Sequence, residues 1–279
     1  MNILIAPFVN GLFGLYYLLG NLGWAVVVIT VLIRLILMPL VFPSLKSAEK
    51  MRELQPKLKK LQEKYGKDKE GLAKAQMDMY KSEGVNPLSG CLPQILQIAV
   101  LIIFFQGFNM VVGFSEGKGT YESLNQLLVP AYQINKDFKF DPYFLGSDLR
   151  MTPSNIFGQG ININLLLPLV LLLGSGLLQY WSAKKMMPST PKVDESAYTK
   201  ATPDKSDDMM EAMRTQSLYM MPAMTVFIGW NFSLGLLLYW FMNSVVMIGQ
   251  QLAMERIKEQ TPLVTTSSKR SPLDKGDRA

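Results

Sequence analysis

The sequence contains no histidine and a single cysteine, Cys91. Without histidine the chain cannot form a Ser-His or Cys-His nucleophilic pair, an H-E-x-x-H zinc site or a histidine proton shuttle. One cysteine cannot build an internal disulfide framework or a thiolate metal cluster. A glycine-rich phosphate-binding motif is also absent. These absences argue against an enzyme, and we expect no cofactor and no metal.

Acidic residues are absent from every long apolar block of the chain. Hydrophobic residues make up 49% of the sequence and the mean hydropathy is +0.16, which is typical of membrane proteins. A bilayer core about 30 Å thick needs about 20 helical residues to cross it. The last apolar block is too long for one crossing, and we expect it to turn at Trp230-Asn231-Phe232-Ser233. The sequence therefore predicts an all-α membrane protein with five transmembrane helices, at 20–43, 86–112, 161–183, 217–231 and 234–254.

The basic residues are distributed unevenly between the segments outside these spans. They number 11 in 44–84, four in 113–160, six in 184–216 and six in 255–279, and none precedes Arg34. Because cytoplasmic loops are enriched in Lys and Arg, we expect the N-terminus outside and the C-terminus in the cytoplasm. A sixth span within 1–19 would disturb this topology. We expect that segment to be an amphipathic helix on the outer surface rather than a cleaved signal.

The segment 44–84 carries a helical pattern. Its apolar residues are spaced three and four apart and so share one face: Met51, Leu54, Leu58, Leu61 and Tyr65. A second amphipathic stretch follows Gly66, which predicts a cytoplasmic helical hairpin; a solvated charged linker is the alternative. The loop 184–216 and the basic tail 255–279 are rich in polar residues and expected to be flexible. The outer loop 113–160 is too polar to cross a membrane, and its sequence indicates no function.

Arg34 is the only formally charged residue within the five expected spans. It lies ten residues before Ser44, about 15 Å along a helix, which is more than its side chain can reach toward the membrane surface. Leaving it in lipid would cost roughly 2.5–3.5 kcal/mol. We therefore expect a water-filled cavity open to the cytoplasm and lined by Thr30 and by the glutamines and serines of the other spans. Each of these polar residues alone is equally well explained by helix–helix hydrogen bonding.

Four segments resemble the YidC membrane protein insertase family, which includes bacterial, mitochondrial and thylakoid members. They are GWAVVVITVLIRLILMPL, ELQPKLKKLQEKYGKDKE, GVNPLSGCLPQILQIAVLIIFF and YMMPAMTVFIGWNFSLGLLLYWFMNSVVMIGQQ. The resemblance implies a hydrophilic groove, open to the cytoplasm, through which nascent membrane proteins enter the bacterial plasma membrane. It also implies action alone or with the Sec translocon, and substrates that arrive from ribosomes. The short tail predicts only weak ribosome binding, and we expect a functional monomer with no role in binding DNA.

The resemblance also assigns residues to the groove. Arg34 corresponds to the groove arginine, Thr30 to the polar residue one turn away, Gln179 to a groove-lining glutamine and Trp240 to an aromatic residue of the last span. We add three polar residues of the spans as candidates: Gln97, Tyr239 and Asn243. Ala99 and Ser233 stand where the family often has proline. A passive channel or small-solute transporter with an anion site at Arg34 is the alternative function, and a structural assembly subunit is a third.

Overall fold

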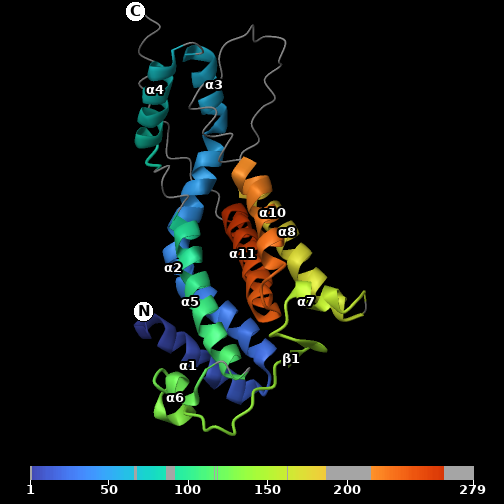
Figure 1. Cartoon of the computed structure of the whole chain (residues 1–279). Coiled ribbons are helices and arrows are strands. Elements are labelled where there is room, and N and C mark those ends of the chain that lie inside the picture. Colours follow the sequence, from blue (N-terminus) through green and yellow to red (C-terminus); the bar gives the residue numbers. More distant parts are fainter. Residues whose placement is uncertain are drawn as a thin grey trace, which may run out of the picture.

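The computed structural model describes residues 2–65, 68–85, 92–115, 117, 119–161, 163–186 and 215–260. The expectations for the loop 187–214 and for the tail 261–279 lie outside the described residues. Figure 1 shows a helical bundle with a helical hairpin at one end, called the hairpin end below, and short loop elements at the other, called the loop end. The main helices are α1 (Asn2–Leu19), α2 (Leu22–Glu53), α3 (Gln55–Tyr65), α4 (Lys69–Ser82), α5 (Leu92–Ser115), α8 (Leu166–Met186), α10 (Met221–Gly229) and α11 (Leu234–Gln260).

Within the described ranges, four helices are long and apolar enough to cross a membrane. The stretches that qualify by length and composition are Leu22–Ser44 in α2, Ile95–Phe114 in α5, Ile163–Lys185 ending in α8, and Leu234–Arg256 in α11. The fifth expected span corresponds to α10, which is preceded by the short π-helix η5 (Gln216–Met220). α10 is shorter than the four spans and packs against α8. The chain is thus a mostly helical membrane protein, and its described residues include four clear spanning helices.

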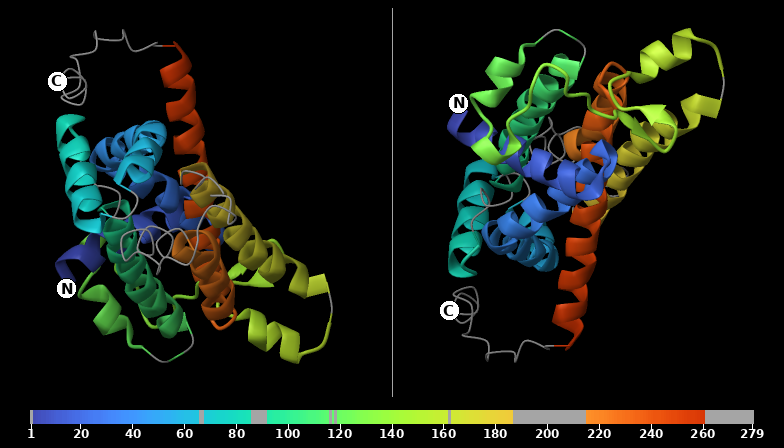
Figure 2. Two further views of the ribbon diagram at one scale, coloured as in Figure 1. Left: turned by 90° about the horizontal axis from the view of Figure 1, so that it is seen from above. Right: turned by 90° about the horizontal axis from the view of Figure 1, so that it is seen from below.

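The bundle is organised around α2 and α11. α11 packs against both α8 and α2, and α5 contacts α1, α2 and α11. Seen along the bundle, α5 and α8 diverge on the two sides of the α2–α11 pair (Figure 2). The first turn of α11 approaches α5 closely, because a Cβ at Gly235 would overlap the ring of Phe108. Glycine at this position therefore sets the distance between the two helices.

α1 buries one apolar face against the bundle. Ile5, Phe8, Val9, Leu12 and Phe13 are all buried, and the helix contacts α2 and α5. The periodicity of this face is helical, so burial against protein explains why the segment folds. The sequence predicted a helix at the membrane surface. The structure adds that this helix is part of the core, while its side of the membrane stays a prediction.

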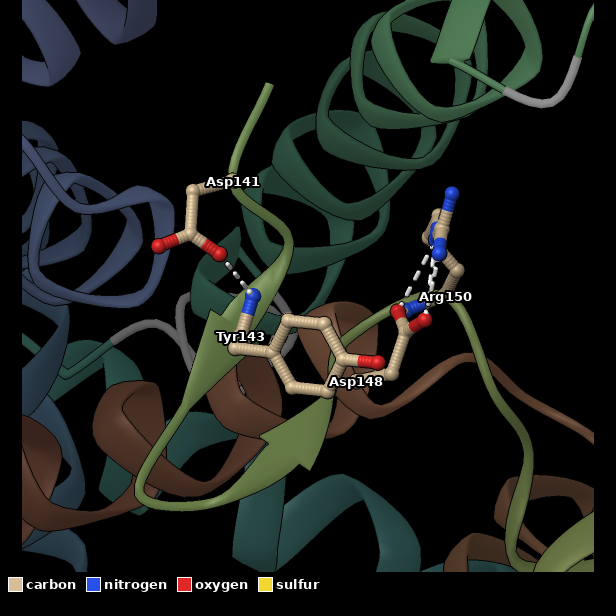
Figure 3. A network of polar contacts seen from close by, with 4 residues as sticks. All are labelled: Asp141, Tyr143, Asp148 and Arg150. Atoms are coloured by element: carbon tan, nitrogen blue, oxygen red, sulfur yellow. Dashed lines mark hydrogen bonds and ion pairs between the residues drawn. The ribbon is translucent and has the colours of Figure 1, made fainter. Parts of the chain in front are cut away.

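The segment between α5 and α8 folds back onto the loop end. It contains α6 (Tyr121–Asn125), η2 (Pro130–Tyr132), α7 (Pro153–Gly158), η3 (Ile163–Leu165) and an antiparallel pair, β1 (Tyr143–Phe144) with β2 (Ser147–Asp148). The two strands are joined by Leu145 and Gly146, which both have positive φ (47° and 82°). Such a turn suits the twist of a tight hairpin. The strand pair and its polar contacts are drawn in Figure 3.

This segment also caps α11. The backbone N–H of Leu234 donates to the carbonyl of Met151 at 2.8 Å, and that of Gly235 donates to the carbonyl of Leu149 at 2.9 Å. The first N–H groups of a helix have no partner within the helix, so the loop satisfies two of them. The sequence indicated no function for 113–160, and the structure gives the segment a packing and capping role.

At the hairpin end, α2 continues well beyond its spanning part before α3 and α4 pack together. Leu54, Leu58, Tyr80 and Val85 form a separate small core, with Met51 and Met79 packed against it. Asp68 caps α4, because its side chain accepts a hydrogen bond from the backbone N–H of Gly71. The expected hairpin boundary at residue 44 therefore falls inside α2, which runs as one helix to Glu53.

Candidate functional site

Arg34 lies where α2, α5 and α11 meet, and its guanidinium is held by two side-chain amides. Its Nε donates to Oδ1 of Asn243 on α11, and its Nη2 donates to Oε1 of Gln97 on α5 at 2.7 Å. The two partners are 209 and 63 residues away in the chain. The hydrogen bonds of Arg34 thus link α2 to both α5 and α11.

The cluster continues from Gln97 to Tyr239. Nε2 of Gln97 donates to the Tyr239 hydroxyl at 3.2 Å. Tyr239 is only 1% exposed, and its ring stacks on that of Phe104 with the centroids 4.1 Å apart. Arginine can only donate hydrogen bonds, so the amide oxygens of both partners must face it. The orientation of Gln97 is therefore fixed from both of its ends.

Among the residues that the structure describes, no carboxylate forms an ion pair with Arg34. Its hydrogen-bond partners among the described residues are neutral, and none of the ion pairs of this part of the chain includes it. The adjacent cavity has a volume of about 10 Å³, which is room for about one water molecule. It is lined by Arg34 and by Thr30, Ile33, Leu37, Val41, Leu96, Gln97, Val100, Tyr239 and Asn243. A positive charge is therefore kept in a confined, mostly apolar space.

Thr30 is in this cavity but does not contact Arg34 through a hydrogen bond. It is 1% exposed, and its hydroxyl donates to the carbonyl of Val26 at 2.6 Å, one turn back along α2. This is the ordinary way in which a threonine satisfies its hydroxyl within a helix. Thr30 thus lines the cavity and forms no hydrogen bond with the guanidinium of Arg34.

Two of the seven candidate residues lie apart from this cluster. Gln179 on α8 accepts a hydrogen bond from the hydroxyl of Thr225 on α10 at 2.9 Å. The ring of Trp240 is packed near that of Phe232, with the centroids 6.0 Å apart. Trp240 follows Tyr239 directly, and successive residues of a helix point about 100° apart. The structure therefore brings together Arg34, Thr30, Gln97, Tyr239 and Asn243, but not Gln179 and Trp240.

Two further residues support the cluster. The Nε2 of Gln250 donates to the backbone carbonyl of Arg34 at 3.4 Å, and Phe104 fixes the ring of Tyr239 by stacking. Gln250 lies seven residues after Asn243, which places both on one face of α11. That spacing is a signal in the sequence. Phe104 is one of many apolar residues of its span and carries no such signal.

The polar side chains of α8 form separate contacts with α11. Nε2 of Gln251 donates to the hydroxyl of Ser182 at 2.6 Å, and Lys185 forms an ion pair with Glu255 at 2.7 Å. These contacts join the two helices toward the hairpin end. Within the described ranges, no group of three or more His, Cys, Asp or Glu residues is placed to hold a metal ion.

Comparison with known proteins gives consistent matches over most of the chain. A family model described as the 60Kd inner membrane protein matches residues 14–261. The chain is 31% identical over 271 residues to the membrane protein insertase YidC of Helicobacter pylori, covering 96% of this chain and 40% of that protein. It is 28% identical over 257 residues to the YidC of Pelobacter propionicus, covering 92% of this chain and 39% of that protein. The chain thus spans about two fifths of the length of these relatives.

The fold also matches a solved structure, described as an active YidC insertase with its first transmembrane domain resolved. The TM-score is 0.52 at 21% sequence identity, and the match covers 91% of this chain and 46% of the other. At this identity the likeness concerns the fold. Together with the family match over residues 14–261, it shows that this chain belongs to the 60Kd inner membrane protein family, the family of the YidC membrane protein insertases.

Proposed function

We propose that this protein is a membrane protein insertase and chaperone of the bacterial plasma membrane. It inserts nascent integral membrane proteins and helps them fold, alone or beside the Sec translocon, with weak and transient contact to the ribosome. The observation that carries this proposal is the environment of Arg34. This charge lies between three spanning helices, and all of its hydrogen-bond partners among the described residues are neutral. An arginine whose internal partners are neutral can bind an acidic group of a client transiently.

The physical mechanism needs no cofactor and no ATP. A polar segment of the client enters a groove beside Arg34, where the bilayer that it must cross is effectively thinner. A carboxylate on that segment interacts with the guanidinium and so enters without being left unpaired in a low-dielectric space. The apolar helix of the client then moves into lipid, where each buried CH₂ group contributes about 0.8 kcal/mol. This partitioning drives release of the polar segment.

The proposed topology follows the distribution of basic residues. The hairpin end, with α3 and α4, faces the cytoplasm, and the loop end faces outward. α10 with η5 serves as a fifth, short span, and the C-terminus is cytoplasmic. The groove opens toward the hairpin end, and Gln179 and Trp240 contact the client beside α8 and α10, away from the Arg34 cluster. The cavity beside Arg34 has a volume of only about 10 Å³, so entry of a client segment requires side chains around it to move.

Site-directed photocrosslinking to a stalled nascent membrane protein tests the insertase proposal. A photoreactive residue at Thr30 or Trp240 should form adducts with the client, whereas one at the exposed Ile3 on α1 should form none or few. A channel or a structural assembly subunit would give no client adducts at any of these positions. Adduct formation therefore separates the three classes of function.

Substitution of Arg34 tests the role of the charge. Arg34→Ala should lower insertion of clients with acidic outer segments about tenfold, because the carboxylate loses its partner. Arg34→Lys keeps the charge, so for insertion itself it should be largely tolerated, but the preference for acidic over neutral clients should fall because lysine lacks the guanidinium fork. Insertion is measured by protease protection of the client, using at least two clients and their Asp→Asn versions. Equal insertion of acidic clients by wild type and Arg34→Ala would disprove this mechanism but not the fold.

A further inference from the structure

Among the described residues, the guanidinium of Arg34 has hydrogen-bond partners at Nε and Nη2 but none at Nη1. Nε donates to Asn243, and one of the two Nη2 protons goes to Gln97. Arginine has five N–H donors in a planar fork. Among the described residues Nη1 has no hydrogen-bond partner, so three donors remain for a ligand. Each of these donors can form a charge-assisted hydrogen bond with an oxygen of a carboxylate.

The two occupying residues are neutral at positions where an acidic residue would fit equally well. Aspartate has nearly the shape of asparagine, and glutamate that of glutamine. Either acid would give Arg34 a charge-assisted hydrogen bond in a partly buried site, which is much stronger than a bond to a neutral amide. A client carboxylate would then have to displace an internal ion pair. The amide partners orient the guanidinium and leave its charge uncompensated.

We propose that Gln97 and Asn243 are positioning residues that make Arg34 selective for a single client carboxylate. They hold the Nε edge of the guanidinium with neutral oxygens and present the Nη1 end to one aspartate or glutamate of the client. This inference rests on the proposed insertase function and deepens it. It assigns the selectivity for acidic clients to three residues on three helices, rather than to the arginine alone.

The surroundings hold this arrangement in place. Gln97 cannot turn its amide without losing both Arg34 and the Tyr239 hydroxyl. Tyr239 in turn is buried and stacked on Phe104. On the other side, Gln250 holds the backbone carbonyl of Arg34. The guanidinium therefore meets a client already oriented, which reduces the entropy lost on binding.

Isosteric charge substitutions test the inference. Asn243→Asp and Gln97→Glu each add a carboxylate beside Arg34 while the arginine itself remains. Insertion of a client with one aspartate in its outer segment should fall about tenfold, whereas insertion of the Asp→Asn version of the same client should not change. The matched control is Asn109→Asp, the same charge change twelve residues further along α5, about 18 Å from Gln97. It should leave insertion of both clients unchanged.

A second pair of variants separates positioning from charge. Asn243→Leu and Gln97→Leu remove the acceptors but add no charge, so the preference for the acidic client over its Asp→Asn version should fall about threefold. Asn243→Thr, which retains a hydroxyl acceptor, should restore most of the preference. A merely structural role would lower insertion of both clients equally, and this outcome would overturn the inference. Insertion of the neutral client also shows that each variant has folded.

The outcomes distinguish this inference from the proposed function on which it rests. If Arg34→Ala has no effect on the acidic client, the mechanism proposed for the insertase fails. If Arg34→Ala impairs the acidic client but Asn243→Asp and Gln97→Glu insert it as well as wild type does, only the positioning role fails. If all three variants fail to insert the acidic client but still insert the neutral one, both proposals are supported.

Discussion

Two arginines of this protein are held in opposite ways. At the loop end, Arg150 forms a bidentate ion pair with Asp148, with distances of 2.9 Å from Nε to Oδ1 and 2.6 Å from Nη2 to Oδ2 (Figure 3). Asp148 also accepts a hydrogen bond from the backbone N–H of Arg150. Inside the bundle, Arg34 is bound by two amides from distant helices. One arginine is neutralised by a residue two positions away, and the other is not neutralised by any described residue.

The difference indicates what each region does. An arginine paired locally with a carboxylate fixes the conformation of a short segment, here the exit from β2 toward α7. An arginine with neutral partners costs more free energy to keep in place, and it contributes less to stability than a paired one. The loop end is thus organised for rigidity. The proposed function assigns binding to the region around Arg34, so changes in the two regions should have different consequences.

The largest loss of stability should come from packing at the loop end. Gly235→Ala places a Cβ on the ring of Phe108, which is itself fully buried, so α11 must move away from α5. We expect a loss of about 3 kcal/mol in the free energy of unfolding. Thermal unfolding of the purified protein in detergent measures it. The control is Gly249→Ala on the same helix, where a Cβ meets nothing within 4 Å; unchanged stability of Gly235→Ala would contradict the close packing.

Breaking the Arg150–Asp148 ion pair at the loop end should have an intermediate effect on stability and little effect on client selection. Asp148→Ala removes a bidentate partner and a backbone acceptor from side chains that are 29% exposed for Arg150 and 11% for Asp148. The expected cost is about 2 kcal/mol. The ratio of acidic to neutral client inserted should stay at the wild-type value. A changed ratio would show that Arg150 and Arg34 do not act independently.

The smallest effect should be found at Tyr80 in the hairpin. Its hydroxyl is buried and has no hydrogen-bond partner among the described residues. Tyr80→Phe should therefore leave the hairpin as stable as wild type or more stable by about 0.5 kcal/mol, because no hydrogen bond is lost. Hydrogen exchange of the α4 amides measures this. Loss of protection in the variant would indicate a partner for the hydroxyl in solution.

The same residue gives the hairpin a dependence on alkaline pH. Burial raises the pKa of Tyr80 above its ordinary value. The folded hairpin thus favours the neutral phenol, and its contribution is fully present below the ordinary tyrosine pKa of about 10. As the pH rises above 10 toward the raised pKa, the unfolded hairpin ionises first and the folded form loses stability. Tyr80→Phe should lack this loss.

Much of the site could be predicted from the sequence because its charge is so rare. Arg34 stands out as the only charge of its span, and Thr30 follows from helical spacing. Gln97, Tyr239 and Asn243 could be named only as polar residues of other spans, since spacing within one helix does not tell which neighbour that helix faces. For the same reason the sequence could not show that Gln179 bonds to Thr225 on α10, and its place in the groove stays a prediction.

The sequence predicted some parts of the fold better than others. Long apolar blocks identify the four long spans well, because the bilayer sets their length. The fifth span is harder, since α10 has only nine residues and continues from the π-helix η5. The segment 113–160 read as a polar loop, yet Leu124, Leu149 and Ile156 are buried in it. Its apolar residues are too scattered along the chain to show a period, and only the folded bundle gives them a partner.

α2 carries one further consequence of its sequence. It includes Pro39 and Pro43, both after Arg34 and before the hairpin. Proline has no N–H to donate, so two backbone hydrogen bonds of the helix are missing between Arg34 and the hairpin core. A helix that lacks backbone hydrogen bonds over a short stretch bends most easily within that stretch. We therefore expect α2 to bend most easily within residues 35–43, so that a movement of the hairpin displaces the Arg34 guanidinium less than it would through an uninterrupted helix.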